Sequence, residues 1–492
     1  MLFFFIAFVF LTFLSVFLLF SFITLVRYQS FRKRKIVGPK PEFPFGNTRK
    51  STLGIQNLIY DVDDSYQLYR NKGPFFGFFS NFRPFLIATD PEFIKFVTMK
   101  EFNKFRNNNT VINPTKDPLL ARSPFRLKDD AWKSKRNETT PVMTPIKLKG
   151  IYPLVRDKTQ HLIDYIKREI EADDTKIFDA RNICTRCTCD TISSLLFDVD
   201  AKSFETDSIY YKMGEGLIRG VRNAVKSSMP FKKLPKQVEN FFKTTAMTSV
   251  KQREENKIER SDLLAYFMYL KERKGISDLD LVGHCTTFFL DGYETSSLVT
   301  HHILYELGKH QDVQQKLREE IQQEGDDMSY EKLFELPYLD QVFNEALRLH
   351  PPLPFATRVC SEDVEFIDKH DHKFEIKKGD VVWVPLHSVQ RDPDHFSSPL
   401  EFDPERYNPE NGGTKPYAEQ AVWIPFGEGP RKCPGVKFGN MQVKTAIVEV
   451  VKNFIVFVDE STVDSPRVGP KEYFNATGDK IYLKFKNVNE NI

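Results

Sequence analysis

The stretch that decides the fold reads Phe426-Gly427-Glu428-Gly429-Pro430-Arg431-Lys432-Cys433-Pro434-Gly435. Two glycines and a proline precede the cysteine and allow tight turns, which leave backbone N–H groups free to point at the sulfur. Such donors, together with a nearby cation, stabilise a thiolate and tune a metal bound to it. A buried free cysteine in a loop is the plainer interpretation of Cys433 taken alone. The rest of the chain has to decide between the two.

The order Phe, Gly, Arg, Cys, Gly at this spacing resembles the haem-binding loop of the cytochrome P450 family. This resemblance implies that Cys433 is the axial ligand of haem b and that Phe426 borders the cofactor. The run Phe-Leu-Asp-Gly-Tyr-Glu-Thr-Ser at 289–296 looks most like insect microsomal members. The implied fold is mainly α with a small β-sheet region.

Further elements of the same family occur in the expected order. Glu345 and Arg348 lie three residues apart, hence on one helix face, where they can pair. The resemblance implies that Arg406 joins this pair as a structural brace. It also implies that four residues bind the haem propionates: Trp132, Arg136, Arg358 and Arg431. For each arginine, a solvated surface charge is the alternative.

The longest predicted helix begins after Ser277, a candidate N-cap, and continues to about His310. Its middle is apolar almost all round, which is typical of a helix buried on every side. The resemblance implies that Glu294 and Thr295 in this helix form an acid–alcohol pair that delivers protons for oxygen activation. A threonine that only bonds its own helix carbonyl is the alternative.

Asp291 departs from the family pattern, which usually has Ala or Gly immediately before Gly292. In the fatty-acid hydroxylase branch of the family, a Glu at this position can become ester-linked to a haem methyl. Asp291 can accordingly form a partial covalent haem link or anchor a polar group of the substrate. The favoured alternative is a carboxyl turned away to bond neighbouring backbone or water.

The N-terminus carries no charged residue from Leu2 to Val26, a run long enough to span a bilayer as a helix. Arg27 and a basic cluster at 32–35 follow, so the positive-inside rule leaves the remainder of the chain in the cytosol. We therefore predict a membrane anchor at 1–27, a basic and proline-rich linker at 28–47, and a single haem-binding catalytic domain at 48–492. The predicted location is the endoplasmic reticulum (microsomal) membrane.

Composition gives the broad class. The 492 residues carry a net charge of +3, which argues against a nucleic-acid binder with a dominant basic field. The 45 phenylalanines indicate an interior suited to lipophilic ligands. Helical periodicity dominates, while the runs 381–384 and 481–485 predict short strands. Cys184, Cys187 and Cys189 lack a fourth ligand at zinc spacing and are interpreted as core residues.

The implied activity is that of a haem-thiolate monooxygenase, which inserts one atom of dioxygen into a lipophilic substrate. Electrons would come from NADPH through NADPH-cytochrome P450 reductase, with cytochrome b5 as a possible further partner. Xenobiotic, hormone and lipid metabolism all fit. The alternatives are a haem-thiolate isomerase or dehydratase and a non-catalytic lipophile-binding protein. The candidate pocket segments are 107–125, 212–242, 288–295, 353–357 and 473–477.

Two surface regions carry further expectations. The amphipathic stretch 214–242, which includes Met229 and Phe231, resembles the variable substrate-entry region of the family. Four lysines lie in segments expected on the reductase-binding face: Lys133, Lys135, Lys432 and Lys437. A solvated basic face explains them nearly as well.

Overall fold

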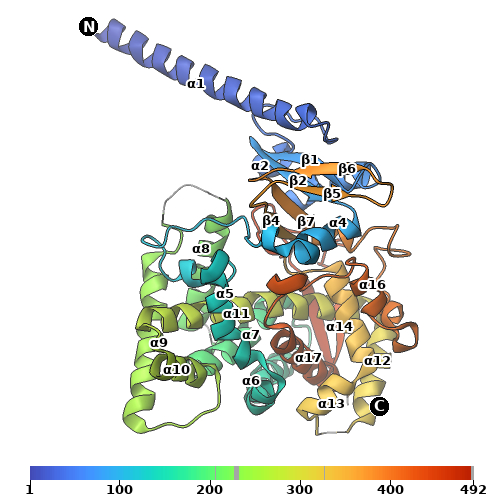
Figure 1. Cartoon of the computed structure of the whole chain (residues 1–492). Helices are drawn as coiled ribbons and strands as arrows, with labels where there is room; N and C mark the ends of the chain where they lie inside the picture. Colours follow the sequence, from blue (N-terminus) through green and yellow to red (C-terminus); the bar gives the residue numbers. More distant parts are fainter. Residues whose placement is uncertain (206, 227–231, 326, 489–492) are drawn as a thin grey trace.

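The computed structural model describes residues 1–205, 207–226, 232–325 and 327–488. Within these ranges a mostly helical body carries three small sheets, and a long N-terminal helix projects from it (Figure 1), which confirms the predicted fold class. The helices are α1 Leu2–Lys33, α2 Arg49–Thr52, α3 Leu58–Tyr69, α4 Pro91–Lys95, α5 Asp129–Thr139, α6 Pro145–Ala172, α7 Ala180–Phe197, α8 Ile209–Lys226, α9 Lys236–Asn256, α10 Leu263–Lys274, α11 Asp278–Lys309, α12 Gln311–Gln323, α13 Tyr330–Glu335, α14 Pro337–Leu349, α15 Leu386–Val389, α16 Lys415–Glu419 and α17 Val436–Asn453. The strands are β1 Phe75–Ser80, β2 Arg83–Ala88, β3 Phe178–Asp179, β4 Phe355–Val359, β5 Val364–Ile367, β6 Lys373–Ile376, β7 Val381–Pro385, β8 Phe454–Val458 and β9 Tyr482–Asn487.

Helix α11 crosses the body and is buried over most of its length (Figure 1). It starts where predicted, because the Ser277 Oγ accepts a hydrogen bond from the Asp280 amide at 3.1 Å. Helices α7 and α17 pack directly against it. A helix enclosed in this way has little freedom to shift, so it is a firm support for the side chains of its middle turns.

The main sheet has the strand order β1-β2-β7-β4, in which β2 and β7 run parallel and the other pairs antiparallel. Strand β7 matches the predicted run 381–384, whereas β9 begins one residue later than predicted and reaches Asn487. The Ile481 carbonyl accepts a hydrogen bond from the Ala180 amide at 2.9 Å, next to the pairing of β3 with β9. The residue therefore joins the start of α7 to the small sheet.

Helix α1 is longer than the predicted anchor at 1–27. Its mean hydropathy reaches 2.8, and it is long and apolar enough to cross a membrane. It continues to Lys33 because Tyr28 and Phe31 are buried at 9% and 5% exposure against the body. A Cβ atom on Gly77 of β1 would lie 2.4 Å from the Phe31 ring. The residues 28–33 of the predicted linker are therefore helical, and packing ties α1 to the main sheet.

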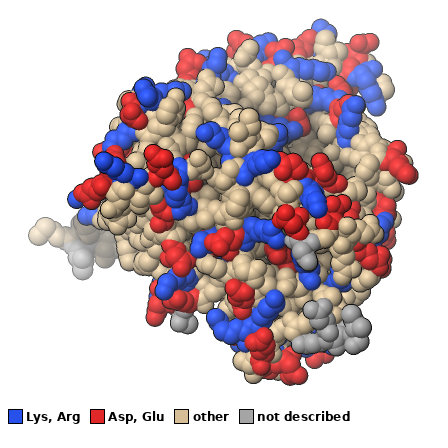
Figure 2. All heavy atoms as spheres, turned by 90° about the horizontal axis from the view of Figure 1, so that it is seen from below, with Lys and Arg blue, Asp and Glu red and all other residues tan. Residues whose placement is uncertain are grey.

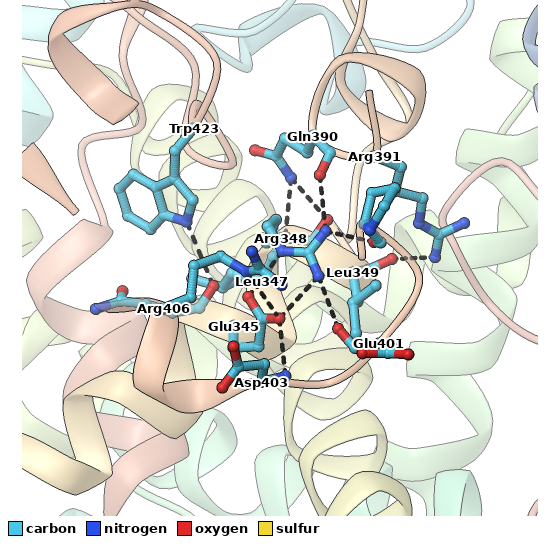
Figure 3. Close-up of polar contacts among 12 residues, drawn as sticks. Glu345, Leu347, Arg348, Leu349, Gln390, Arg391, Glu401, Asp403, Arg406 and Trp423 are labelled. Carbon is cyan, nitrogen blue, oxygen red and sulfur yellow. Dashed lines mark hydrogen bonds and ion pairs between the residues drawn. The ribbon is translucent and has the colours of Figure 1, made fainter. Parts of the chain in front are cut away.

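A network of buried charges joins α14 to the segment before α16 (Figure 3). Arg348 is fully buried and donates two hydrogen bonds of 2.7 Å to the Glu345 carboxylate. Arg406 approaches the same carboxylate at 3.4 Å, so the predicted three-residue brace is confirmed. The remaining donors of Arg348 go to carbonyls of three residues, at 3.0, 2.6 and 3.0 Å: Gln390, Pro399 and Glu401.

The three cysteines of α7 are buried among apolar side chains, in agreement with their interpretation as core residues. Burial raises the pKa of Cys187 and Cys189 to about 12. Of the predicted entry region, Met229 and Phe231 lie outside the described residues, while α8 and α9 flank that gap. The face opposite α1 mixes Lys and Arg with Asp and Glu (Figure 2), in keeping with the small net charge.

Candidate functional site

Two glycines with unusual backbone conformations shape the cysteine loop. Gly427 and Gly429 both have φ of 70°, a region that other L residues rarely adopt. A Cβ atom at Gly429 would also lie 1.9 Å from the carbonyl oxygen of Thr98. The Cys433 amide donates to the Phe426 carbonyl at 2.9 Å. Backbone geometry therefore fixes the loop around the thiol.

The Cys433 side chain faces an interior hollow. It is accessible to solvent, although burial raises the pKa of its thiol to about 11. The sulfur is both accessible and buried because protein surrounds it on all sides and leaves a space next to it. The Gly435 N–H bonds the sulfur and lowers this pKa, as does the charge of Arg136, whereas Asp291 raises it. A thiol in this setting is suited to bind a buried cation, because metal coordination removes its proton.

Arg431 holds the loop against the segment that precedes α5. Its guanidinium stacks over the Trp132 ring at 4.2 Å. It also donates to three backbone carbonyls at 2.8, 3.1 and 3.0 Å: Arg106, Pro124 and Leu127. These contacts bring together Trp132 and Arg431, two of the residues predicted to bind the haem propionates.

Two further arginines lie around the same loop. Arg136, one turn after Trp132 on α5, donates to the Lys432 carbonyl at 2.7 Å. Arg358 on β4 donates to the Asn108 Oδ1 at 2.9 Å, and its Nε has no hydrogen-bond partner among the described residues. Arg136, Arg358 and Arg431 are called the arginine cluster below.

The charges of the arginine cluster are not balanced by a described carboxylate. Burial lowers the pKa of Arg431 to about 9, and repulsion by Arg358, Arg106 and Arg136 adds to this effect. Burial alone lowers the pKa of Arg358 to about 10. No carboxylate of the described residues forms an ion pair with the cluster. Haem b would supply two propionate carboxylates for these cations and an iron for Cys433, so the residues fit this group.

Glu294 and Thr295 adjoin in α11 but face different partners. The Glu294 carboxylate is fully buried, and its Oε1 accepts a hydrogen bond from Arg181 of α7 at 2.6 Å. Its Oε2 has no partner among the described residues. Burial raises the pKa of Glu294 to about 7, while the charge of Arg181 opposes this rise. The Thr295 hydroxyl donates to the Asp291 carbonyl at 2.5 Å.

Asp291 lines the same hollow as Cys433. Its side chain is exposed, yet burial raises the pKa of its carboxyl to about 7, with an opposing effect from the charge of Arg126. The carboxyl forms no hydrogen bond with the residues that the structure describes. It therefore bonds no described backbone group, which was one of the two partners, backbone or water, that the favoured alternative named.

Known proteins agree with this geometry. The family model "Cytochrome P450" matches residues 41–485, which is most of the chain. The chain belongs to the cytochrome P450 family. It is thus a monooxygenase of the kind that uses haem and dioxygen.

This P450 is similar to several insect proteins. It is 32% identical over 484 residues to "Probable cytochrome P450 28d2" of Drosophila melanogaster, which covers 94% of this chain and 95% of that protein. It is 31% identical over 467 residues to "Probable cytochrome P450 9f2" of the same species, covering 86% and 88%. "Cytochrome P450 6A1" of Musca domestica is 29% identical over 488 residues, covering 94% of each. The predicted likeness to insect members is confirmed.

The structure also adds residues to this P450 site that sequence reasoning missed. Arg181 binds Glu294 from 113 positions away in the chain, and no local pattern links the two. Arg126 lies close enough to Asp291 to affect its pKa. The sequence signal for Arg126 was a charged residue between the apolar residues Phe125 and Leu127, shortly before the start of α5.

Proposed function

We propose that this P450 is a membrane-anchored monooxygenase that transfers one atom of dioxygen to a lipophilic substrate, with electrons from NADPH passed on by a flavoprotein reductase. Its role would be in xenobiotic, hormone or lipid metabolism. The observation that carries the proposal is the arginine cluster, which no carboxylate of the described part of the chain pairs with, beside an inward-facing Cys433. A protein that merely buried a cysteine would have no use for three cations around it.

The chain's own residues would divide the work as follows. Bound haem supplies the activation of dioxygen and the oxidation itself. Cys433 would hold its iron, and the arginine cluster with Trp132 would hold its propionates. Glu294, half protonated near pH 7, would supply a proton from its carboxyl. The Thr295 hydroxyl, with some accessible surface, would accept and pass on that proton through water.

Isotope incorporation tests the proposed reaction. Purified holoprotein would be incubated with reductase, NADPH and labelled dioxygen, and products of lipophilic candidates analysed by mass spectrometry. The proposal expects one labelled oxygen per product and no turnover without NADPH. Rearrangement without NADPH would indicate an isomerase or dehydratase. Binding without any product would indicate a sequestering protein. Either result would overturn the proposal.

We further propose that α1 anchors the protein in the endoplasmic reticulum membrane with its body in the cytosol. The sequence offers a built-in reporter, since Asn137 lies in an Asn-x-Thr sequon and is exposed. Expression in microsomes should leave Asn137 without glycan, and added protease should digest the body. Glycan at Asn137 together with a protected body would place the domain in the lumen and contradict this orientation.

A reductase would dock beside the cysteine loop in this proposal. Lys133, Lys432 and Lys437 are exposed there and can meet acidic side chains. Lys135 is less suited, because it is bound to Glu138 at 2.8 Å and to Asp280 at 3.1 Å. Cytochrome b5 would compete for the same lysines.

A further inference from the structure

Arg126 is a buried cation that the arginine cluster does not account for. The carbonyls of Pro124 and Leu127, on either side of it, accept hydrogen bonds from Arg431, which ties its backbone to the cysteine loop. The side chain is only 9% exposed. Its guanidinium makes no hydrogen bond or ion pair within the part of the chain that the structure describes. A buried guanidinium carries five donors and a full charge, so this arrangement calls for a ligand.

The electrostatic neighbours of Arg126 separate it from the propionate-binding arginines. Three groups raise its pKa against the effect of burial: Tyr473, Asp291 and Asp117. The charges that act on Arg431 are instead the other arginines and Asp129. Arg126 is therefore influenced by Asp291 of α11, Tyr473 and Asp117, and not by the arginine cluster.

Of these three neighbours, Asp117 already has partners, because its carboxylate accepts backbone hydrogen bonds from Lys233 and Leu234 at 2.8–3.0 Å. Asp291 and Tyr473 differ, since neither side chain hydrogen-bonds a described residue. Both keep accessible surface deep in the fold, where burial raises the pKa of each. Arg126, Asp291 and Tyr473 thus form a set of unpartnered polar groups around one space, called the polar subsite below.

Three candidate pocket segments of the chain meet in this subsite. Asp291 lies in the segment 288–295 and Tyr473 in 473–477, while Arg126 directly follows 107–125. The Asn475 amide donates to the Pro352 carbonyl at 2.9 Å and fixes the turn that carries Tyr473. Asp291 also affects the pKa of Cys433, so the subsite adjoins the position of the cofactor.

We propose that the polar subsite binds the carboxylate of an amphipathic organic acid, with Arg126 as its counter-ion and Asp291 and Tyr473 as hydrogen-bond donors. This inference rests on the proposed function and names its substrate class. A guanidinium binds a carboxylate through two parallel hydrogen bonds, which suits this ligand better than a neutral lipid. A protonated Asp291 can donate to the same oxygens, and the arriving anion favours that protonated form. An organic cation is disfavoured because Arg126 repels it.

Matched ligands test the proposal on the full-length holoprotein. Dodecanoic acid, its methyl ester and dodecanol would be titrated, with haem absorbance and thermal unfolding as two readouts. The proposal expects the acid to bind about 10- to 100-fold more tightly than the ester, as for a charge-assisted hydrogen-bonded pair. It also expects the acid to raise the unfolding temperature more than the ester. Equal affinities for acid and ester in the wild-type protein would overturn it without any variant.

Two variants assign the effect to Arg126. Arg126→Gln should remove the preference for the acid and leave ester affinity unchanged, whereas Arg126→Lys should retain part of it. Arg34→Gln is the control, because Arg34 lies outside the candidate pocket segments and is bound to Asp380 at 2.6 Å, so its replacement should leave both affinities unchanged. An acid preference that survives Arg126→Gln would show that Arg126 merely neutralises Asp291. If the protein binds haem without a thiolate spectrum, the proposed function fails. A thiolate spectrum without acid preference contradicts this inference alone.

Discussion

This protein has two groups of buried arginines, and they differ in whether a carboxylate pairs with the guanidinium. Arg348 is fully buried, is paired with Glu345 at 2.7 Å and donates to three further carbonyls. Arg358 and Arg431 are also buried or half-buried, but no carboxylate of the described residues pairs with them, and burial lowers the pKa of both. A satisfied buried charge serves the fold, whereas an unsatisfied one indicates a ligand. This contrast separates the structural arginines from those that we propose bind the cofactor.

Removal of the counter-charge from the satisfied group should have the largest effect. Glu345→Gln leaves Arg348 buried without an anion, which we expect to lower the free energy of unfolding by about 3–5 kcal/mol. Urea unfolding of the wild-type and variant proteins measures this difference. Arg406→Gln is the control and should cost less, because Arg406 contacts Glu345 only at 3.4 Å. A Glu345→Gln protein as stable as wild type would break the comparison.

The unsatisfied group should respond differently. Arg358→Leu removes an uncompensated cation, so we expect the haem-free protein to lose only about 1 kcal/mol, from the donor lost to Asn108. Haem should nevertheless dissociate about 10- to 100-fold faster, since a propionate loses a charge-assisted hydrogen bond. Transfer of haem to apomyoglobin gives the rate. An unchanged dissociation rate would show that Arg358 does not bind the cofactor.

Glu294 of α11 offers a sharper test within the site. Glu294→Gln keeps the shape of the side chain but cannot release a proton, so we expect product formed per NADPH to fall about 10-fold. Oxygen consumed should then appear as peroxide or water instead of product. Stopped-flow and product analysis with a common substrate would measure both quantities. Unaltered coupling would mean that Glu294 serves only to bind Arg181.

The Arg181–Glu294 pair also predicts a pH dependence of stability. The pKa of Glu294 rises to about 7 on folding, so the folded state binds its proton more tightly than the unfolded state. Its contribution to stability therefore falls as the pH rises from about 4.5 through 7. Arg181→Gln should raise this pKa further and steepen the decline, while Arg181→Lys should not. Unfolding free energies between about pH 5 and about pH 8 measure the slopes. Parallel slopes in all three proteins would contradict the pairing.

The smallest effect concerns the surface. Charge reversal in Lys133→Glu and Lys437→Glu should raise the KM for reductase about 2- to 5-fold without changing the haem spectrum, because exposed charges mainly steer association. Lys369→Glu, in the turn between β5 and β6, serves as a control. A loss equal in all three variants would reflect net charge and not a docking site.

Local signals made much of this architecture predictable from the sequence. The cap at Ser277, the pairing of Glu345 with Arg348 and the glycines of the cysteine loop depend on neighbours within a few residues, so the spacing alone indicates them. The extension of α1 to Lys33 was missed because burial of Phe31 against the body overrides a boundary drawn from hydropathy.

Contacts between segments that are distant along the chain could not be predicted from the sequence. Arg181 and Glu294 are joined by the packing of α7 on α11. The charge of Arg126 affects the pKa of Asp291, and Arg431 holds the segment of Arg126 against the cysteine loop. The identities of the site residues were therefore predictable in part. Their partners required the fold.

The most direct test of the central claim is the absorbance spectrum of the reduced, carbon-monoxide-bound holoprotein, recorded for wild type and for Cys433→His. The account predicts the long-wavelength Soret band of a thiolate-bound haem in the wild-type protein and its loss in Cys433→His, with haem still held by the arginine cluster. A wild-type spectrum of the imidazole type, or a thiolate band that survives in Cys433→His, would contradict the assignment of Cys433 as the ligand.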